Sequence, residues 1–143
     1  MSDVVLDASM FVSAISPKEV HHADARKMYD SYDLDRPFIV PALFRVEVVA
    51  ALVRRGEPLE LIDTVDVLVS GPRFHSVALD PALLDEAARV ARKARLRAYD
   101  AVYVALALRH KAVLMTLDTE VRVRVADAFP TMRVVDDQSE EVP

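Results

Sequence analysis

The chain of 143 residues and 15.9 kDa fits one compact domain, and its 52% hydrophobic content excludes an intrinsically disordered protein. The absence of cysteine excludes disulfides, thiolate nucleophiles and cysteine-ligated metal sites, and two glycines are too few for a glycine-rich phosphate-binding loop. The net charge of −5 does not exclude a nucleic-acid partner, because four acids lie in the segment 136–143 and four others are assigned below to one site, which leaves +3 elsewhere.

Apolar runs of strand length alternate with helical patterns along the chain. In order, the predicted elements are a strand at 4–6, helical turns from 9 to about 17, a helix at 21–32, a strand at 38–40, helices at 41–55 and 58–69, a strand at 74–79, helices at 81–95 and 98–110, a strand at 113–116, a helix at 119–129 and a strand at 132–135. Pro41 is expected in the first turn of its helix, and Gly56 is expected to end that helix. This order predicts an α/β fold with a mostly parallel sheet covered on both faces.

No segment of the sequence indicates a membrane span or a targeting signal. The longest apolar run covers the eight residues 101–108, whereas a membrane helix needs roughly 18. Asp3 precedes the first apolar stretch without any basic residue, unlike the start of a signal peptide. We therefore expect a cytoplasmic protein, with one domain over 1–135 and a disordered acidic tail over 136–143.

Four acidic residues interrupt apolar segments. Asp7 directly follows the first predicted strand, and Asp118 follows the fourth by two residues. Glu47 and Asp100 lie in helices that are almost wholly apolar, so they cannot easily reach water. A lone buried carboxylate costs several kcal/mol unless it is paired or binds a metal. Because ligands of parallel sheets bind beyond the carboxyl ends of the strands, we predict that these four acids gather there around a shared divalent cation.

Each acid has a simpler interpretation when it is taken alone. Asp7 and Asp118 could each cap the helix that follows. Asp100 lies in a first helical turn, where the helix dipole favours an acid, and Glu47 could pair with one of the arginines at 54 and 55. The shared site is favoured because one cause then explains four acids from four separate segments. All-oxygen ligands select hard cations such as Mg²⁺ and Mn²⁺, which activate water and neutralise phosphate oxygens.

Four strings carry these acids: VLDAS at 5–9, VEV at 46–48, RAYDAVYVALA at 97–107 and LMTLD at 114–118. The strings resemble the PIN-domain family, and in particular the VapC-type toxins of toxin–antitoxin modules. The match in order and spacing covers essentially the whole chain, and the third string is its most specific part. The resemblance implies a PIN-like three-layer α/β/α sandwich with about five strands and a Mg²⁺- or Mn²⁺-dependent endoribonuclease. Carried over position by position, it puts six residues in the site: Asp7, Glu47, Asp100 and Asp118 as the acidic quartet, with Ser9 and Thr116 as supporting hydroxyls.

Basic residues cluster shortly before the third acid, with five in the nine residues 89–97. The simpler interpretation is a solvated helix face, and the functional one is a patch that steers phosphates into the site. The residues assigned to this steering are Arg92, Arg95 and Arg97. Two tyrosines, at 99 and 103, flank the third acid; they could stack on a base, although core packing is the simpler expectation.

The preferred hypothesis is a VapC-type toxin that cleaves RNA. Asp7, Asp100 and Asp118 would hold a first metal ion, and Glu47 would complete the site or hold a second ion, with water as the nucleophile. Three expectations concern partners: an RNA substrate, a cognate antitoxin that inserts Arg or Lys among the acids, and a homodimer formed through helices 41–55 and 58–69. The alternatives are an RNA-processing or single-strand nuclease and a catalytically silent PIN-like binding module.

Overall fold

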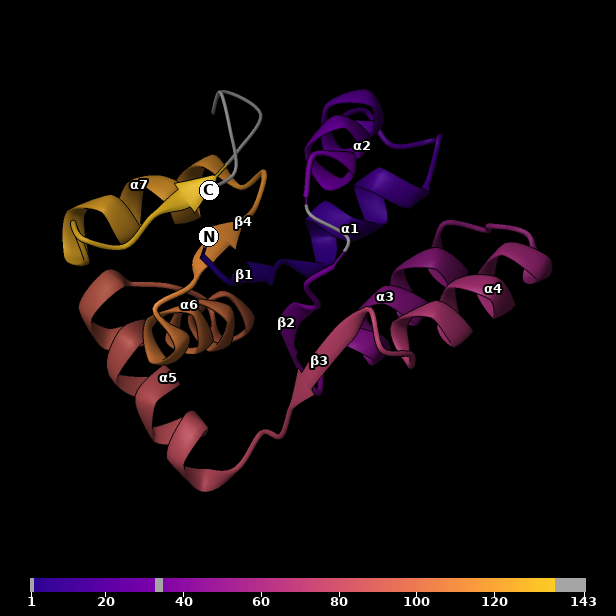
Figure 1. The fold of residues 1–143 in the computed structure, drawn as a ribbon. Helices are drawn as coiled ribbons and strands as arrows, with labels where there is room; N and C mark the ends of the chain where they lie inside the picture. The colour runs from indigo at the N-terminus through magenta and orange to yellow at the C-terminus, as the bar shows by residue number, and fades with distance from the viewer. Residues whose placement is uncertain (1, 33–34, 136–143) are drawn as a thin grey trace.

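The structure is a computed structural model that describes residues 2–32 and 35–135, so the predicted tail at 136–143 lies outside the described residues. Five strands form one sheet in the order β3-β2-β1-β4-β5, and all neighbouring pairs are parallel (Figure 1). The strands are β1 (Val4–Leu6), β2 (Phe38–Pro41), β3 (Phe74–Val77), β4 (Val113–Met115) and β5 (Val134–Val135). The predicted α/β class and five-stranded parallel sheet are confirmed.

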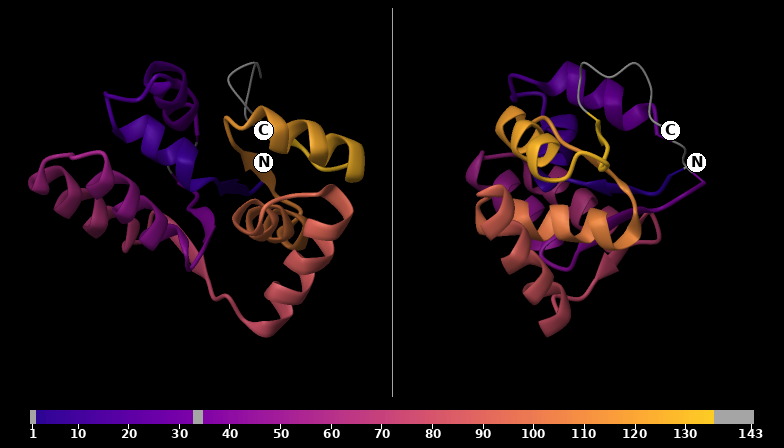
Figure 2. Two further views of the ribbon diagram at one scale, coloured as in Figure 1. Left: turned by 180° about the vertical axis from the view of Figure 1, so that it is seen from behind. Right: turned by 90° about the vertical axis from the view of Figure 1, so that its left-hand side faces the viewer.

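Helices connect successive strands and cover both faces of the sheet. They are α1 (Ala8–Ile15), α2 (His22–Asp30), α3 (Phe44–Arg54), α4 (Leu59–Val69), α5 (Pro81–Ala94), α6 (Ala98–His110) and α7 (Thr119–Ala128). Helices α1 to α4 lie on one side of the sheet and α5 to α7 on the other (Figures 1 and 2). Right-handed crossovers require this division, because the chain moves outward from β1 to β3 and then crosses back to β4. The result is the expected three-layer α/β/α sandwich.

The core lies on both faces of the short central strands. β1 and β4 are buried along their whole length, as a parallel sheet between two helical layers requires. Helix α6 packs directly on β1, β2 and β4, and its residues 101–107 are all buried, which explains why this segment is apolar on every side. On the other face, Phe11 of α1 contacts the rings of Phe44 and Phe74 at centroid distances of 5.6 and 5.4 Å.

Several element boundaries differ from the predicted ones. Pro41 is the last residue of β2 and not part of a helical turn, so α3 begins only at Phe44. The cause is continued pairing, since the Ala42 N–H donates a 2.8 Å hydrogen bond to the Val77 carbonyl and keeps the chain extended. Strand β3 ends at Val77, and β5 contains only two residues. Among the described residues, no helix is long and apolar enough to cross a membrane.

Candidate active site

Strands β1 and β4 are neighbours in the sheet, yet the connections that leave β1 and arrive at β4 run on opposite faces. Such a switch point opens a crevice at the carboxyl ends of the strands. Asp7 follows β1 directly, and Thr116 and Asp118 follow β4. The Asp7 N–H donates to the Met115 carbonyl at 3.1 Å, which holds the two chain segments side by side. The topology therefore brings three of the predicted site residues to one edge.

Both carboxylate oxygens of Asp7 accept hydrogen bonds. Oδ1 accepts from the Ser9 N–H at 3.3 Å, which makes Asp7 the N-cap of α1. Oδ2 accepts from two hydroxyls, that of Ser9 at 2.9 Å and that of Thr116 at 2.8 Å. Burial raises the pKa of Asp7, the hydrogen bonds from Thr116 and Ser9 oppose that shift, and the charge of Asp100 adds to it. The two hydroxyls predicted to support the acids thus both bind the first acid.

Thr116 links the first acid to the fourth. While its hydroxyl donates to Asp7, the same oxygen accepts the Asp118 N–H at 3.1 Å, and the residue is only 1% exposed. Asp118 is the N-cap of α7, because its Oδ1 accepts the Val121 N–H at 3.1 Å. The simpler interpretation of Asp7 and Asp118 as helix caps is therefore correct. This role does not exclude Asp118 from the site, because capping uses only Oδ1; Oδ2 of Asp118 faces the guanidinium of Arg97.

Asp100 lies in the first turn of α6, where Arg97 contacts it. The Arg97 Nε donates to Oδ2 of Asp100 at 3.3 Å, and its Nη2 lies 3.6 Å from Oδ2 of Asp118. Burial raises the pKa of Asp100, the Arg97 guanidinium lowers it, and the charges of Asp118 and Glu120 raise it further. One guanidinium thus bridges the third and fourth acids. The sequence indicated Arg97 as an RNA contact and gave no signal for this bridge.

Glu47 reaches the site from α3 and is held there by Tyr103 of α6. The Tyr103 hydroxyl donates to Oε1 of Glu47 at 2.8 Å. Burial raises the pKa of Glu47, the hydrogen bond from Tyr103 lowers it, and the charges of Asp7 and Asp100 raise it. The structure therefore pairs Glu47 with Tyr103, and Arg55 at the end of the same helix pairs with Glu19.

The two tyrosines that flank Asp100 have different environments. Tyr103 is 2% exposed, as expected for a core residue, and burial together with the Glu47 charge raises the pKa of its hydroxyl, which therefore stays a donor. Tyr99 is 59% exposed, so the expectation of core packing is wrong for it. The two side chains are four residues apart and so share one face of α6, but Tyr99 lies in the exposed first turn of the helix, whereas Tyr103 lies one turn further along, among the buried residues 101–107.

The four acids from four segments influence one another's ionisation. The charge of Asp100 acts on Asp7 and Glu47, and Asp118 acts on Asp100. Their oxygen-only donor set fits a hard divalent cation such as Mg²⁺ or Mn²⁺. Within residues 2–32 and 35–135, no three or more acidic or histidine side chains lie close enough together to hold a metal ion. Hydroxyls and the Arg97 guanidinium connect the acids in this arrangement.

A sequence model of the PIN domain matches residues 4–127. The chain belongs to the PIN-domain family. This match covers the segments that contain all four acids and both supporting hydroxyls. No curated protein sequence matches the chain.

Solved structures share the fold of this PIN domain. A toxin–antitoxin complex from Klebsiella pneumoniae superposes with a TM-score of 0.71 at 15% identity, covering 99% of this chain and 100% of that one. The sarcin-ricin loop cleaving toxin VapC20 of Mycobacterium tuberculosis gives 0.72 at 13% identity, covering 85% and 94%. FitAcB from Neisseria gonorrhoeae gives 0.68 at 16% identity, covering 94% and 97%. At such low sequence identities, these TM-scores show a common fold alone.

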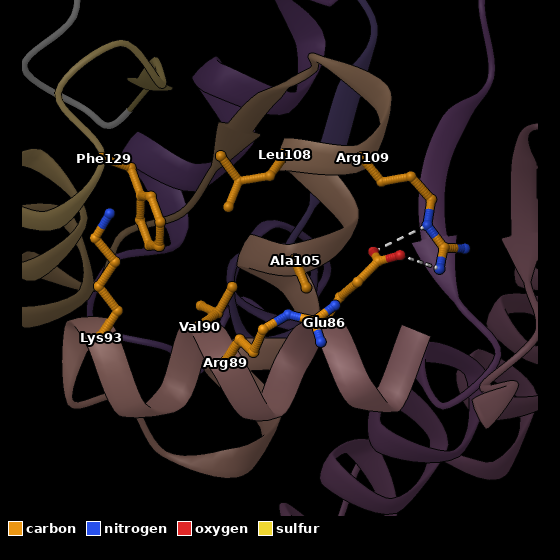
Figure 3. Close-up of a pocket in the computed structure, with 8 residues that line it drawn as sticks. All are labelled: Glu86, Arg89, Val90, Lys93, Ala105, Leu108, Arg109 and Phe129. Carbon is orange, nitrogen blue, oxygen red and sulfur yellow. Dashed lines mark hydrogen bonds and ion pairs between the residues drawn. The ribbon is translucent and has the colours of Figure 1, made fainter. Parts of the chain in front are cut away.

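The basic stretch of the PIN domain does not form one patch. Arg89 and Lys93 share one face of α5 and line a hollow of about 380 Å³ between α5, α6 and α7, where the Lys93 Nζ lies 5.0 Å from the centre of the Phe129 ring (Figure 3). At the other end of that hollow, Glu86 is bonded to Arg109 through both carboxylate oxygens (Figure 3). None of the four acids lines it, so it is separate from the candidate active site.

The three arginines assigned to RNA steering also lie in different places. Arg95 and Arg97 line a small hollow of about 90 Å³ together with Asp100 and Glu120. Arg92 is exposed on α5 and does not line that hollow. A larger groove of about 700 Å³ runs along α3 beside the site, and its lining includes Glu47 and the exposed Tyr99. Glu120, which acts on Asp100, is a site neighbour that the sequence analysis missed because it follows an ordinary N-cap in an exposed first turn.

Proposed function

We propose that this PIN domain is a Mg²⁺- or Mn²⁺-dependent endoribonuclease and the toxin of a toxin–antitoxin pair. The observation that carries the proposal is that neighbouring side chains link the four acids near the carboxyl edge of β1 and β4. Thr116 binds Asp7 and the Asp118 N–H, Arg97 contacts both Asp100 and Asp118, and the charges of Asp7 and Asp100 act on Glu47. The family match and the likeness to toxin–antitoxin structures support the same assignment.

Asp7, Asp100 and Asp118 would hold a first divalent ion, and Glu47 would complete its surroundings or hold a second ion. When bound, such an ion supplies positive charge for the phosphate oxygens and lowers the pKa of water. Within the chain, Ser9 and Thr116 fix the orientation of the Asp7 carboxylate, so it does not have to reorganise during the reaction.

Glu47 is a carboxylate suited to accept a proton from the attacking water. Its raised pKa increases its proton affinity, and Tyr103 fixes its direction through Oε1. Water would attack the phosphorus and pass its proton to the carboxylate, the P–O bond to the leaving nucleotide would break, and the leaving oxygen would take a proton from solvent. Arg97, which is 78% exposed at the same mouth, is available to meet a phosphate group.

The partner that fits this site is an antitoxin segment with one Arg or Lys and apolar neighbours. Carboxylates bind a guanidinium readily, and Asp100 and Asp118 already do so with Arg97. The groove along α3 offers apolar contacts from Leu43, Val46 and Tyr99 directly beside Glu47. A basic side chain in the site and apolar side chains in the groove would together exclude RNA.

We also propose a homodimer formed through α3 and α4. Five of the large apolar side chains that are exposed in the described residues lie on these two helices: Val46, Val53, Leu59, Val67 and Leu68. An apolar surface of this kind on two adjacent helices favours association, and a two-fold dimer is the commonest closed form.

The test is RNA cleavage by the full chain in Mn²⁺, with Asp100→Asn and Asp80→Asn as the compared variants. Asp100→Asn is expected to lower the rate by at least about 100-fold, because an amide is a poor ligand for a hard cation. Asp80 is an N-cap aspartate of α5 outside the site, so Asp80→Asn should keep the activity. Full cleavage in EDTA would contradict the metal mechanism, and RNA binding without cleavage by the unaltered protein would favour the silent binding module.

A further inference from the structure

Arg97 brings a cation of the chain itself to two of the four acids. We propose that the Arg97 guanidinium is a built-in competitor of the divalent ion: it occupies Oδ2 of Asp100 and Oδ2 of Asp118 in the metal-free protein and must leave when the ion binds. Arg97 therefore sets the metal affinity of the site. This inference rests on the proposed function, because it concerns the same metal.

The backbone of Arg97 explains why the side chain takes this direction. The residue is the N-cap of α6 with extended backbone angles (φ −67°, ψ 159°), and its side chain makes no capping hydrogen bond. The guanidinium instead reaches forward by three residues to Asp100 and across to Asp118 at the start of α7. From position 97 the side chain thus contacts the starts of both helices at once.

The oxygens that Arg97 contacts are those that a metal would need. Oδ1 of Asp118 is used in capping α7, so Oδ2 is the oxygen that this residue can offer to an ion. Oδ2 of Asp100 is likewise the oxygen bonded to Arg97. A guanidinium and a divalent cation repel each other at such short range, so they cannot share these two oxygens.

The Arg97 side chain is also free to leave. Its side chain is 78% exposed, whereas those of Asp100 and Asp118 are 19% and 29% exposed. Arg124 lines the same small hollow but is held by Glu120 at 2.5 Å and by the Arg95 carbonyl. Displacement of Arg97 therefore needs no movement of the fold, only the rotation of one flexible side chain.

The experiment measures Mn²⁺ binding alone, without RNA, by titration calorimetry on the full chain. Arg97→Gln is expected to lower the Kd for Mn²⁺ about tenfold, or about 1.4 kcal/mol. Arg97→Lys should give a smaller change, because an ammonium group keeps the positive charge and loses only the planar fork of the guanidinium. Arg92→Gln, which removes an exposed charge of the same basic stretch, should change the Kd less than twofold. If Arg97 had only a structural role, Arg97→Gln would raise the Kd for Mn²⁺ instead of lowering it.

Thermal unfolding gives a second readout. In EDTA, Arg97→Gln should melt at a lower temperature than the unaltered protein, because the acids lose their counter-ion. On addition of Mn²⁺, the melting temperature of Arg97→Gln should rise by more than that of the unaltered protein. Equal or weaker Mn²⁺ binding by Arg97→Gln would overturn this inference while the metal site stands. Binding by neither protein would overturn both proposals, and binding by Arg97→Gln alone would support the competition. The double variant Arg97→Gln/Asp118→Asn should lose the tighter Mn²⁺ binding of Arg97→Gln, because the Asp118 carboxylate that Arg97 contacts is then absent.

Discussion

The hydroxyl of Tyr103 donates a 2.8 Å hydrogen bond to Oε1 of Glu47, and this bond ties α6 to α3 across the edge of the sheet where the acids meet. Both residues interrupt otherwise apolar helix faces. The bond lowers the pKa of Glu47, whereas burial and the charges of Asp7 and Asp100 raise it. Tyr103 thus limits how far the pKa of the proposed proton acceptor rises.

Tyr103→Phe removes only the donor from this pair. Without the hydrogen bond, the pKa of Glu47 should rise, so the acidic limb of the pH–rate profile should move to higher pH. The free energy of unfolding should fall by about 1–2 kcal/mol, because a buried acceptor loses its partner. Tyr99→Phe is the matched control, since Tyr99 is exposed and lies four residues away on the same helix. An acidic limb that stays in place in Tyr103→Phe would exclude Glu47 as the group that titrates.

Thr116→Val tests the link between the first and fourth acids. Valine has the same shape, but it removes both the donor to Asp7 and the acceptor of the Asp118 N–H. We expect a loss of about 1–3 kcal/mol in unfolding free energy and a fall in RNA cleavage of at least about tenfold. Thr116→Ser keeps the hydroxyl and should therefore retain most of the unfolding free energy and most of the RNA cleavage. If Thr116→Ser is as inactive as Thr116→Val, the methyl group matters and the hydroxyl does not.

The acids could be found in the sequence because each one contradicts its surroundings. Glu47 and Asp100 stand out in apolar helices, and Asp7 and Asp118 stand out at the ends of apolar strands. The alternation of strands and helices gave the fold class for the same reason, since burial on both faces leaves an unmistakable apolar pattern. Patterns of this kind are local, so they identify elements and the polar residues that interrupt them.

Contacts between elements could not be predicted in this way. Tyr103 reads as one more apolar residue of its helix, and only the packing of α6 beside α3 shows that its hydroxyl meets Glu47. Arg97 belongs to a run of basic residues that looks uniform in the sequence, yet the turn between α5 and α6 separates it from Arg89 and Lys93. Pro41 was misplaced because the pairing of Ala42 with β3 overrides the local preference of proline for a helix start.

The proposed homodimer gives a prediction about mass. At micromolar concentration, sedimentation should show a species of twice 15.9 kDa. Val67 of α4 is 75% exposed, and Val67→Glu should shift the protein to the monomer by placing a charge in the apolar contact. Val123→Glu on α7 makes the same change at a site that is 59% exposed on the other side of the sheet and should leave the dimer intact. A monomer in the unaltered protein would refute the assignment.

The raised pKa values of the acids predict how stability depends on pH. Burial and mutual repulsion raise the pKa of Asp7, Glu47 and Asp100 above their ordinary values. A carboxyl whose folded pKa is raised contributes stability that is fully present below its ordinary pKa and is lost as the pH rises through the folded value. In EDTA, the protein should therefore lose stability as the pH rises above the ordinary pKa values of these carboxyls, and Mn²⁺ should restore it.

Asp7→Asn removes one of these charges and keeps the cap of α1, because asparagine caps a helix about as well as aspartate, but its amide NH2 replaces the oxygen that accepts the Ser9 and Thr116 hydroxyls. In EDTA at pH 7, the variant should melt above the unaltered protein, and the difference should disappear as the pH falls below the ordinary pKa of Asp7. Its gain from Mn²⁺ should be smaller than that of the unaltered protein, which reaches about 2.7 kcal/mol at a hundredfold excess over the Kd. Asp80→Asn, at an N-cap outside the site, should show neither effect. If Asp7→Asn melts lower at pH 7 and the unaltered protein gains nothing from Mn²⁺, Asp7 acts only as a helix cap and the repulsion between the acids does not limit stability.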